Sequence, residues 1–321
     1  MVEQVGIAMV GCGQIAEAHF KAVEAVPQAR LVVAVDVDGD RAASAAERYG
    51  ALRWSTDYAE VLSDSEVNAV VLCLPHDLHL PFSVQAARAG KHILVEKPMA
   101  LSEVEAQEMV AAAESANVHL SVGQSTRFLA PIQKAKDLQK EGRIGRVINV
   151  LAQRTFWIEG LSTDWRREME ACGGLYLPLF GSHDIDAMLW LLDDTPHRVR
   201  GSIRAVSPVS GGDSDGVIGL DFADGKVASI GFATRCKQRR FEMVFVGEAG
   251  TMSVTRNGLQ VDGEVVDVSE DAGAFELQMR GFVESLCAGA EPPTPGREVL
   301  RVMRVLDLVR EASDRGVAIA F

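Results

Sequence analysis

The sequence has few cysteines, no long apolar run and no surplus of positive charge. Its five cysteines, at positions 12, 73, 172, 236 and 287, are odd in number and include no CxxC pair. This spacing predicts reduced thiols and argues against a disulfide framework. No apolar run approaches the ~18 residues of a membrane span, and the N-terminus lacks the basic region of a secretory signal. We therefore expect a cytoplasmic protein.

The charge and the spacing of polar residues exclude further classes. The formal net charge of −13 argues against nucleic acid or an anionic membrane as a partner, since both require clustered Lys and Arg. No group of His, Cys, Asp and Glu has metal-ligand spacing, so no metal is predicted. The chain of 321 residues is 47% hydrophobic and 24% charged, which is typical of a globular protein with room for two domains.

Residues 1–123 alternate short apolar runs with helical patterns. Strand-like runs such as "VGIAMVG" (5–11) and "LVVAVDV" (31–37) are followed by segments with helical spacing. This alternation is typical of βαβ units. It predicts an N-terminal α/β domain of the Rossmann type, with a doubly wound parallel sheet.

The pattern changes in residues 124–321. Long runs that alternate apolar and polar residues, beginning with "RVINVLAQRTFWI" (146–158), are separated by "DG", "EAG" and "NG" turns. Two helical segments, near 274–288 and 297–315, close the chain. We expect a C-terminal α+β domain for substrate binding and oligomerisation, with a large, mostly antiparallel open sheet.

The stretch "GCGQIA" (11–16) lies between the first predicted strand and a helix. Gly11 permits a tight turn, Gly13 lets the backbone approach a pyrophosphate, and Ala16 allows close packing of helix on strand. The N–H groups at the start of the helix would face the phosphates. The loop therefore predicts a dinucleotide site, whose residues are Gly11, Cys12, Gly13, Gln14 and Ile15.

Asp36 ends the second predicted strand, where a carboxylate accepts hydrogen bonds from the ribose hydroxyls of a dinucleotide. A carboxylate there repels a 2′-phosphate, and no basic residue follows until Arg41. NAD is therefore favoured over NADP. Asp38 and Asp40 are expected to form a solvated turn and a helix N-cap.

Lys97, in "AGKHILVEKPMALS", stands just past the carboxyl end of a predicted strand. Ligands of open α/β sheets bind at that edge. Pro98 follows at once and constrains the turn, because its ring fixes φ and removes a donor. A lysine at a strand end is usually a solvated charge, but this one is placed where it could contact a ligand.

Four stretches in this order resemble the Gfo/Idh/MocA oxidoreductases, a family that includes inositol dehydrogenase and glucose–fructose oxidoreductase. They are "GCGQIAEAHF", "VDVDGDRA", "LPHDLHLPFSVQAARAGKHILVEKP" and "DWR…GG…GSHDID". The resemblance covers most of residues 4–200. It implies an NAD-dependent enzyme that transfers a hydride between nicotinamide and a secondary alcohol or ketone of a sugar, cyclitol or related polyol.

The resemblance also assigns roles to residues near the strand ends. Lys97 would be catalytic and contact the substrate, and Glu96 would help to hold the cofactor ribose. The Lys97–Pro98 peptide is often cis in relatives. The other cofactor-binding residues would be the "P-x-x-x-H" pair and two neighbours: Pro75, His79, His76 (where relatives carry Asn) and Gln124.

His183 is preceded by an unusual neighbour. Relatives with dehydrogenase activity carry an Asp four residues before this histidine, and here that position is Leu179. Leucine can neither accept a proton nor orient an alcohol, so Lys97 and His183 remain as candidates for proton transfer. Asp186 matches a structural position, and we expect Asp184 to face solvent or the domain boundary.

Aromatic and basic side chains of the C-terminal part complete the predicted substrate site. Aromatic faces suit the apolar faces of a sugar ring. The candidates that contact substrate, besides Lys97 and His183, are Arg127, Trp157, Trp165, Arg166 and Tyr176. The remaining histidines, among them His19, are expected to be structural. The open sheet and the resemblance imply a homodimer or homotetramer.

Two alternatives remain open. Some proteins that resemble this family hold NAD tightly and cleave glycosidic bonds through a transient oxidation, so a redox glycosidase fits the same motifs. Leu179 is also compatible with an NAD-binding protein of impaired catalysis.

Overall fold

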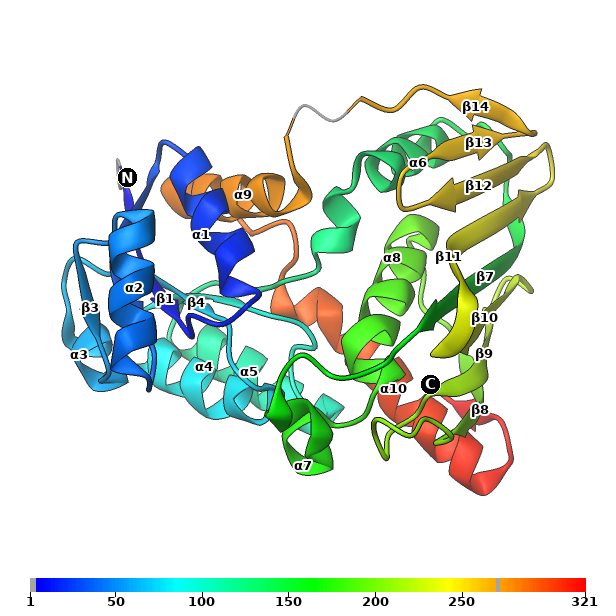
Figure 1. Cartoon of the computed structure of the whole chain (residues 1–321). Coiled ribbons are helices and arrows are strands. Elements are labelled where there is room, and N and C mark those ends of the chain that lie inside the picture. The colour runs from blue at the N-terminus through cyan, green and yellow to red at the C-terminus, as the bar shows by residue number, and fades with distance from the viewer. Residues whose placement is uncertain (1–3, 270–271) are drawn as a thin grey trace. The chain divides into compact units, whose positions relative to one another are not determined.

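The computed structural model describes residues 4–269 and 272–321 (Figure 1). These residues form two compact units. Unit 1 contains residues up to 125 together with 272–300, and unit 2 contains residues 126–269 together with 301–321. Residues 272–300 thus group with the N-terminal part of the chain, although they follow the second sheet in sequence. The predicted boundary between two independently folding domains, residues 1–123 and 124–321, stays a prediction.

The sheet of unit 1 contains six strands, all parallel, in the order β3-β2-β1-β4-β5-β6. This is the doubly wound order of a Rossmann fold, as predicted. Strands β1 and β4 are buried along their whole length, and β5 is buried after its first residue, because helices cover both faces of the sheet. The strands are β1 (Val5–Val10), β2 (Ala29–Val35), β3 (Arg53–Ser55), β4 (Ala69–Leu72), β5 (His92–Val95) and β6 (Leu120–Val122).

The helices of unit 1 begin and end at recognisable signals. The side chain of Asp38 accepts a hydrogen bond from the backbone N–H of Arg41, so the predicted N-cap is confirmed. Gly50, with φ of +69°, ends the same helix in the left-handed region that glycine favours. The helices are α1 (Ala16–Ala25), α2 (Gly39–Tyr49), α3 (Tyr58–Ser63), the 3₁₀ turn η1 (His76–Leu78), α4 (His79–Arg88), α5 (Glu103–Ser115) and α9 (Ala274–Ala288).

Helix α9 packs against α1 and β1 (Figure 1). Its buried face contributes Met279, Phe282 and Val283 to an apolar core that also contains Ile7 and Phe20. Burial of this face stabilises α9 against α1 and β1, because an isolated amphipathic helix of this length is only marginally stable in water. The helix therefore supports the strand that leads into the glycine loop.

The sheet of unit 2 contains nine strands in the order β14-β13-β12-β11-β7-β10-β9-β8-β15. Only β7 and β10 pair in parallel, so the mostly antiparallel sheet is confirmed. Its strands are β7 (Val147–Trp157), β8 (Arg198–Arg204), β9 (Asp215–Asp221), β10 (Val227–Ala233), β11 (Arg235–Gly247), β12 (Thr251–Thr255), β13 (Leu259–Val261), β14 (Glu264–Val266) and β15 (Ile319–Ala320).

One face of this sheet is covered and the other is open. In β10, Ala228, Ile230 and Phe232 are buried, whereas the alternate residues are at least partly exposed. The helical elements described with this unit are η2 (Ser125–Phe128), α6 (Ala130–Lys140), η3 (Asp164–Arg167), α7 (Met169–Cys172), the π-helical turn η4 (Leu177–Gly181), α8 (Ser182–Leu192) and α10 (Gly296–Arg315), the last of which begins in unit 1. No described helix is both long and apolar enough to span a bilayer.

Candidate active site

The glycine loop follows β1 at the switch point of the unit 1 sheet, between β1 and β4. Gly11 has φ of +88°, and a Cβ atom there would come within 2.3 Å of the carbonyl oxygen of Cys73, which follows β4. Only glycine permits this approach of the two strand ends. A Cβ on Gly13, by contrast, would meet nothing within 4 Å, so this side of the loop is open.

Backbone donors of this loop are available to a ligand. Helix α1 begins at Ala16 without a side-chain cap, and Gln14 and Ile15 are exposed. Within the described part of the chain, the N–H groups of Gly13, Gln14 and Ile15 donate to no protein acceptor. Free N–H groups at a helix start bind phosphate well, so the loop fits the diphosphate of a dinucleotide. Such a cofactor supplies hydride transfer when it is bound.

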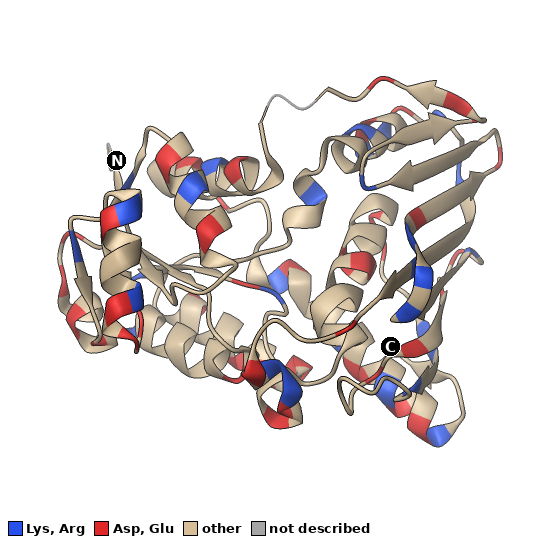
Figure 2. Cartoon of the chain, viewed as in Figure 1, with Lys and Arg blue, Asp and Glu red and all other residues tan. Residues whose placement is uncertain are grey.

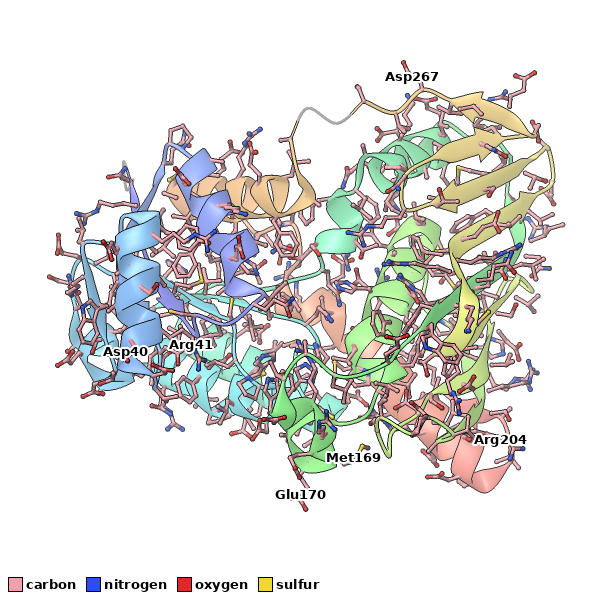
Figure 3. All side chains as sticks on the ribbon, in the orientation of Figure 1. Asp40, Arg41, Met169, Glu170, Arg204 and Asp267 are labelled. Atoms are coloured by element: carbon pink, nitrogen blue, oxygen red, sulfur yellow. The ribbon has the colours of Figure 1, made fainter. Side chains whose placement is uncertain are left out.

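Asp36 follows β2 and is hydrogen-bonded to the glycine loop. One carboxylate oxygen accepts from the backbone N–H of Cys12 at 2.8 Å, and the other from that of Asp38 at 3.0 Å. The guanidinium of Arg41 lies 3.4 Å from the first oxygen. Figure 3 labels Arg41, at the start of α2. Burial, followed by the charge of Asp36, raises the pKa of the Cys12 thiol to about 12, which keeps it neutral.

Lys97 lies in a loop that is otherwise buried. From Ile93 to Ala100 it is the single residue with appreciable exposure, and its peptide bond to Pro98 is cis, as the resemblance implied. The carboxylate of Glu96 accepts a hydrogen bond from the backbone N–H of Lys97 at 3.1 Å. The backbone therefore holds the lysine side chain on the accessible side of the loop.

Glu96 is itself fixed by a histidine of α1. Its other oxygen lies 2.8 Å from Nε2 of His19, and both side chains are almost completely buried. Burial raises the pKa of Glu96, but the hydrogen bond from His19 and the charges of His19 and Lys97 outweigh it, so the pKa lies below its ordinary value. Glu96 is thus held as a carboxylate beside Lys97.

His79 links the ends of β4 and β5. Its Nδ1 lies 2.8 Å from the carbonyl oxygen of Pro98, and its Nε2 lies 3.1 Å from that of Leu74. Burial is the main cause that lowers the pKa of this imidazole, although the carbonyl contacts oppose it. His79 of the predicted "P-x-x-x-H" pair therefore holds the loop that carries Lys97. Pro75, the other member of the pair, directly precedes η1.

The predicted cofactor residues come together at one edge of the unit 1 sheet. They follow the carboxyl ends of β1, β2, β4, β5 and β6, where ligands of such sheets bind. His76 is buried beside His79, with ring centroids 5.7 Å apart, and Gln124 is buried just after β6.

In unit 2, His183 lies on the second residue of α8. The preceding turn, η4, is π-helical: the N–H of Ser182 bonds the carbonyl oxygen of Leu177, five residues earlier. From Leu175 to Leu189, only Leu179, Phe180 and His183 are not fully buried. Leu179 and His183 therefore share the accessible side of this segment, although the turn between them is wider than the expected α-helical spacing.

Asp213 anchors the start of this segment, and sequence reasoning missed it. Its carboxylate accepts from the backbone N–H groups of Leu175 at 3.2 Å and Leu177 at 2.5 Å. A Cβ on Gly174 would lie 2.3 Å from the same carboxylate, which explains the glycine there. No local sequence signal links these residues, because Asp213 lies more than 30 positions further along the chain.

Several of the predicted polar residues form buried ion pairs. Arg127 is 1% exposed and binds Asp186 through two hydrogen bonds, of 2.7 and 2.6 Å. Asp184 is also 1% exposed, so the expectation that it faces solvent was wrong. It pairs with Arg154 and accepts a hydrogen bond from the hydroxyl of Tyr176 at 2.7 Å. A buried carboxylate requires such partners.

Tyr176 is buried and stacks on Phe232, with ring centroids 3.7 Å apart. The other predicted substrate residues are more exposed: Trp157 ends β7, and Trp165 and Arg166 lie on η3, where the guanidinium is 4.7 Å from the indole centroid. Trp157 is exposed, whereas Trp165 and Arg166 are half-buried. Contact of any of these five predicted residues with substrate stays a prediction.

Comparison with known proteins places the two units in one family. Residues 5–124 match the model described as "Oxidoreductase family, NAD-binding Rossmann fold", and residues 132–253 match the Gfo/Idh/MocA C-terminal domain. The chain belongs to the Gfo/Idh/MocA oxidoreductases. The first match contains every predicted cofactor residue from Gly11 to Gln124.

Similar proteins act on sugars. This oxidoreductase is 26% identical to the 1,5-anhydro-D-fructose reductase of Ensifer adhaerens over 90% of each chain. It is 28% identical to the NADP⁺-dependent D-xylose 1-dehydrogenase of Haloarcula marismortui, over 97% of this chain and 91% of the relative. A levoglucosan dehydrogenase solved with NADH has the same fold, with a TM-score of 0.91 and 20% identity over 99% of each chain.

His19 is a residue of this oxidoreductase that sequence reasoning assigned to structure alone. Because it contacts Glu96, which bonds Lys97, we expect His19→Leu to lower kcat about tenfold, as loss of a supporting hydrogen bond commonly does. The pKa of Glu96 should rise, because burial raises it and the hydrogen bond from His19 no longer opposes that effect. The acid limb of the kcat–pH profile should therefore shift to higher pH. His19→Gln, whose amide can still donate, should restore part of both. An unchanged pH profile in His19→Leu would contradict a role through Glu96.

Proposed function

We propose that this protein is an NAD-dependent dehydrogenase or reductase that acts on a CH–OH or carbonyl group of a sugar, cyclitol or related polyol. The observation that carries the proposal is the placement of Lys97. Its backbone is bonded to buried Glu96, and the next peptide contacts His79, at the sheet edge that also carries the glycine loop. The reductase and dehydrogenase relatives named above support a sugar substrate.

Lys97 and His183 are proposed to handle the proton. A lysine of ordinary pKa, ~10.4, is a poor base at neutral pH. As a cation, however, it can donate a proton to a carbonyl oxygen and polarise it. Without the acid that relatives carry at the position of Leu179, alcohol oxidation should suffer more than carbonyl reduction. We therefore propose that reduction is the more efficient direction.

The preference for NAD is proposed from Asp36, whose carboxylate lies beside the glycine loop. Arg41 opposes this preference, because its guanidinium contacts Asp36 and is a cation that a 2′-phosphate would attract. Relatives and neighbours differ: the Haloarcula dehydrogenase is named for NADP⁺, and the levoglucosan dehydrogenase was solved with NADH.

The proposed activity is tested with a panel of sugars, sugar ketones and cyclitols, each assayed with NAD or NADH in the appropriate direction. We expect coenzyme absorbance to change in step with product. Release of free sugar from a glycoside without net NADH would instead indicate a redox glycosidase. Tight NAD binding without turnover over the whole panel would indicate an NAD-binding protein of impaired catalysis.

Leu179→Asp tests the effect of the missing acid. Because the new carboxylate would share the accessible side with His183, we expect kcat for alcohol oxidation to rise about tenfold. Carbonyl reduction should change less than oxidation. Leu179→Asn, which is polar but cannot accept a proton, is the matched control. If oxidation gains nothing from Asp, or gains as much from Asn, the proposed role of the acid fails.

We also propose that the open face of the unit 2 sheet forms a homodimer contact, within a homodimer or homotetramer. This face exposes Leu151 by 51%, together with Val217 and Val227. Apolar side chains clustered on one face commonly mark such contacts. Leu151→Arg should halve the molar mass measured by light scattering after gel filtration, and Val104→Arg, at an exposed position of α5 in unit 1, should not. A monomeric wild-type protein would refute the contact.

A further inference from the structure

Helix α8 carries two aspartates, drawn red in Figure 2, and no lysine or arginine. Both carboxylates are buried, and each pairs with an arginine from another element. Arg127, the partner of Asp186, is itself 1% exposed. The side chain of Arg154, the partner of Asp184, is 15% exposed. The second pair therefore reaches the molecular surface, and the first does not.

Arg154 lies on the covered face of the unit 2 sheet. Its register partners are Phe232 on β10 and Phe241 on β11, and Phe232 is buried on that face. Paired residues on neighbouring strands project to the same face. Arg154 thus faces α8, on the side opposite to Leu151 and the proposed homodimer contact. Its guanidinium carbon lies 4.2 Å from the centroid of the Phe241 ring.

Asp184 fixes the orientation of the guanidinium. The Nε atom of Arg154 donates to one carboxylate oxygen at 3.0 Å, and Nη2 donates to the other. The hydroxyl of Tyr176 donates to the same carboxylate at 2.7 Å. The pairing with Asp184 uses one edge of the planar guanidinium. The other edge contains Nη1, which donates to no acceptor among the residues that the structure describes.

Arg154 also contacts the turn that leads into His183. Its guanidinium carbon lies 6.0 Å from the centroid of the Phe180 ring. Phe156, on the same face of β7, packs against Phe180 with ring centroids 4.4 Å apart. Asp184, which holds the guanidinium, directly follows His183 in sequence. These contacts link Arg154 to the segment that carries the proposed proton-transfer histidine.

The covered face is accessible at this place. Val150 and Met243, further along the same face, are buried. The side chains around the guanidinium or beside His183 are only half-buried: Arg154, Phe156, Leu179, Phe180 and Phe241. Unit 2 therefore presents an accessible surface here, on which a cationic edge lies among phenyl rings next to His183.

The charges of the pair select the kind of group that this surface can bind. The carboxylate of Asp184 neutralises the guanidinium, so an anionic substrate group would bring a second negative charge close to Asp184 at a half-buried position. Hydroxyls need only donors and acceptors, and the N–H groups of a guanidinium edge can meet two neighbouring oxygens. Phenyl rings suit the apolar faces of a sugar ring. The surface therefore favours an uncharged polyhydroxylated ring.

We propose that Arg154 binds substrate through its second edge, which donates to two neighbouring hydroxyls of an uncharged sugar or cyclitol. The substrate class narrows accordingly, to the exclusion of sugar acids and phosphorylated sugars. Sequence reasoning gave Arg154 no role, because Asp184, which orients it, lies 30 residues further along the chain. This inference rests on the proposed function, since it specifies the substrate class of that same oxidoreductase.

Calorimetry on the NADH-loaded enzyme tests the inference with D-glucose, each of its monodeoxy analogues and D-glucuronate as probes. We expect the loss of either of two neighbouring hydroxyls to weaken binding about tenfold, as loss of a hydrogen bond to a charged group commonly does. Glucuronate should bind no more tightly than glucose. Tenfold tighter binding of glucuronate would overturn the uncharged class. Equal affinity for glucose and all its deoxy analogues, or no measurable binding of glucose, would overturn the hydroxyl contact.

Arg154→Lys keeps a cation beside Asp184 but removes the planar edge. Glucose should bind this variant about tenfold more weakly, and the two sensitive deoxy analogues should bind it as glucose does. Arg146→Lys is the matched control, because Arg146 pairs with Glu248 at 2.7 Å before the opposite end of β7, and it should leave every affinity unchanged. Equal effects of the two variants, or the same analogue losses in Arg154→Lys as in wild type, would remove Arg154 from the substrate site.

The unfolding temperature of each variant is measured alongside binding. Should Arg154→Lys not fold, Arg154→Gln/Asp184→Asn removes both charges of the pair together and carries the same expectation for the deoxy analogues. Binding that depends on Arg154 without hydride transfer to any sugar of the activity panel would refute the proposed function and leave the contact standing. Hydride transfer that is indifferent to Arg154 would refute the contact and leave the function standing.

Discussion

Lys97→Met is expected to lower kcat/KM about a thousandfold in the reducing direction, which is within the range for loss of a positioned acid. The affinity for NADH should change less than about threefold, because we propose that the diphosphate binds the backbone donors of Gly13 to Ile15 rather than this amine. Met keeps the length and apolar character of the lysine stem. Steady-state rates and a fluorescence titration of NADH measure the two effects separately.

Lys140→Met provides the control for this experiment, since Lys140 is an exposed lysine at the end of α6. It should leave both quantities unchanged. Retention of more than about a tenth of wild-type activity in Lys97→Met would remove the lysine from proton transfer. A parallel loss of NADH affinity would show that Lys97 serves binding instead.

Asp36→Asn is expected to lower the preference for NAD over NADP about a hundredfold, measured as the ratio of the two kcat/KM values. The substitution removes a like charge from the position of a 2′-phosphate and weakens the acceptor for ribose hydroxyls. The remaining amide oxygen can still accept from the N–H of Cys12, so the glycine loop should keep its form. Arg41, no longer paired with a carboxylate at position 36, becomes available to the phosphate.

Asp38→Asn is the matched control, because Asp38 also pairs with Arg41 and asparagine still caps α2. It should change the ratio of the two kcat/KM values less than about threefold. Adding Arg41→Ala to Asp36→Asn should remove most of the gain with NADP. A ratio that does not move in Asp36→Asn would show that another group selects the coenzyme.

Local patterns in the sequence predicted most of unit 1. The glycine loop, Asp36 and Lys97 each stand at a strand end, and strand ends of a parallel sheet meet at one edge. The short strand β3 was missed, because "RWS" is three residues long, at the sheet edge and partly exposed. The place of α9 was also missed, since its amphipathic pattern does not indicate which sheet it covers.

Partners far apart in sequence could not be predicted. Glu96 and His19 are 77 residues apart, and the pairs of Asp184 with Arg154 and of Asp186 with Arg127 span 30 and 59 residues. Each polar residue has several possible partners, and only packing selects one of them. For this reason the sequence placed Asp184 at solvent or the domain boundary and assigned His19 to structure alone.

The most direct test of the account is a crystal structure of the enzyme with coenzyme and a bound substrate or unreactive analogue. We predict that the Nζ atom of Lys97 and a ring nitrogen of His183 both lie about 3 Å from the oxygen of the reacting carbon. The account would be contradicted if either group lay too far from that oxygen for a hydrogen bond or one bridging water.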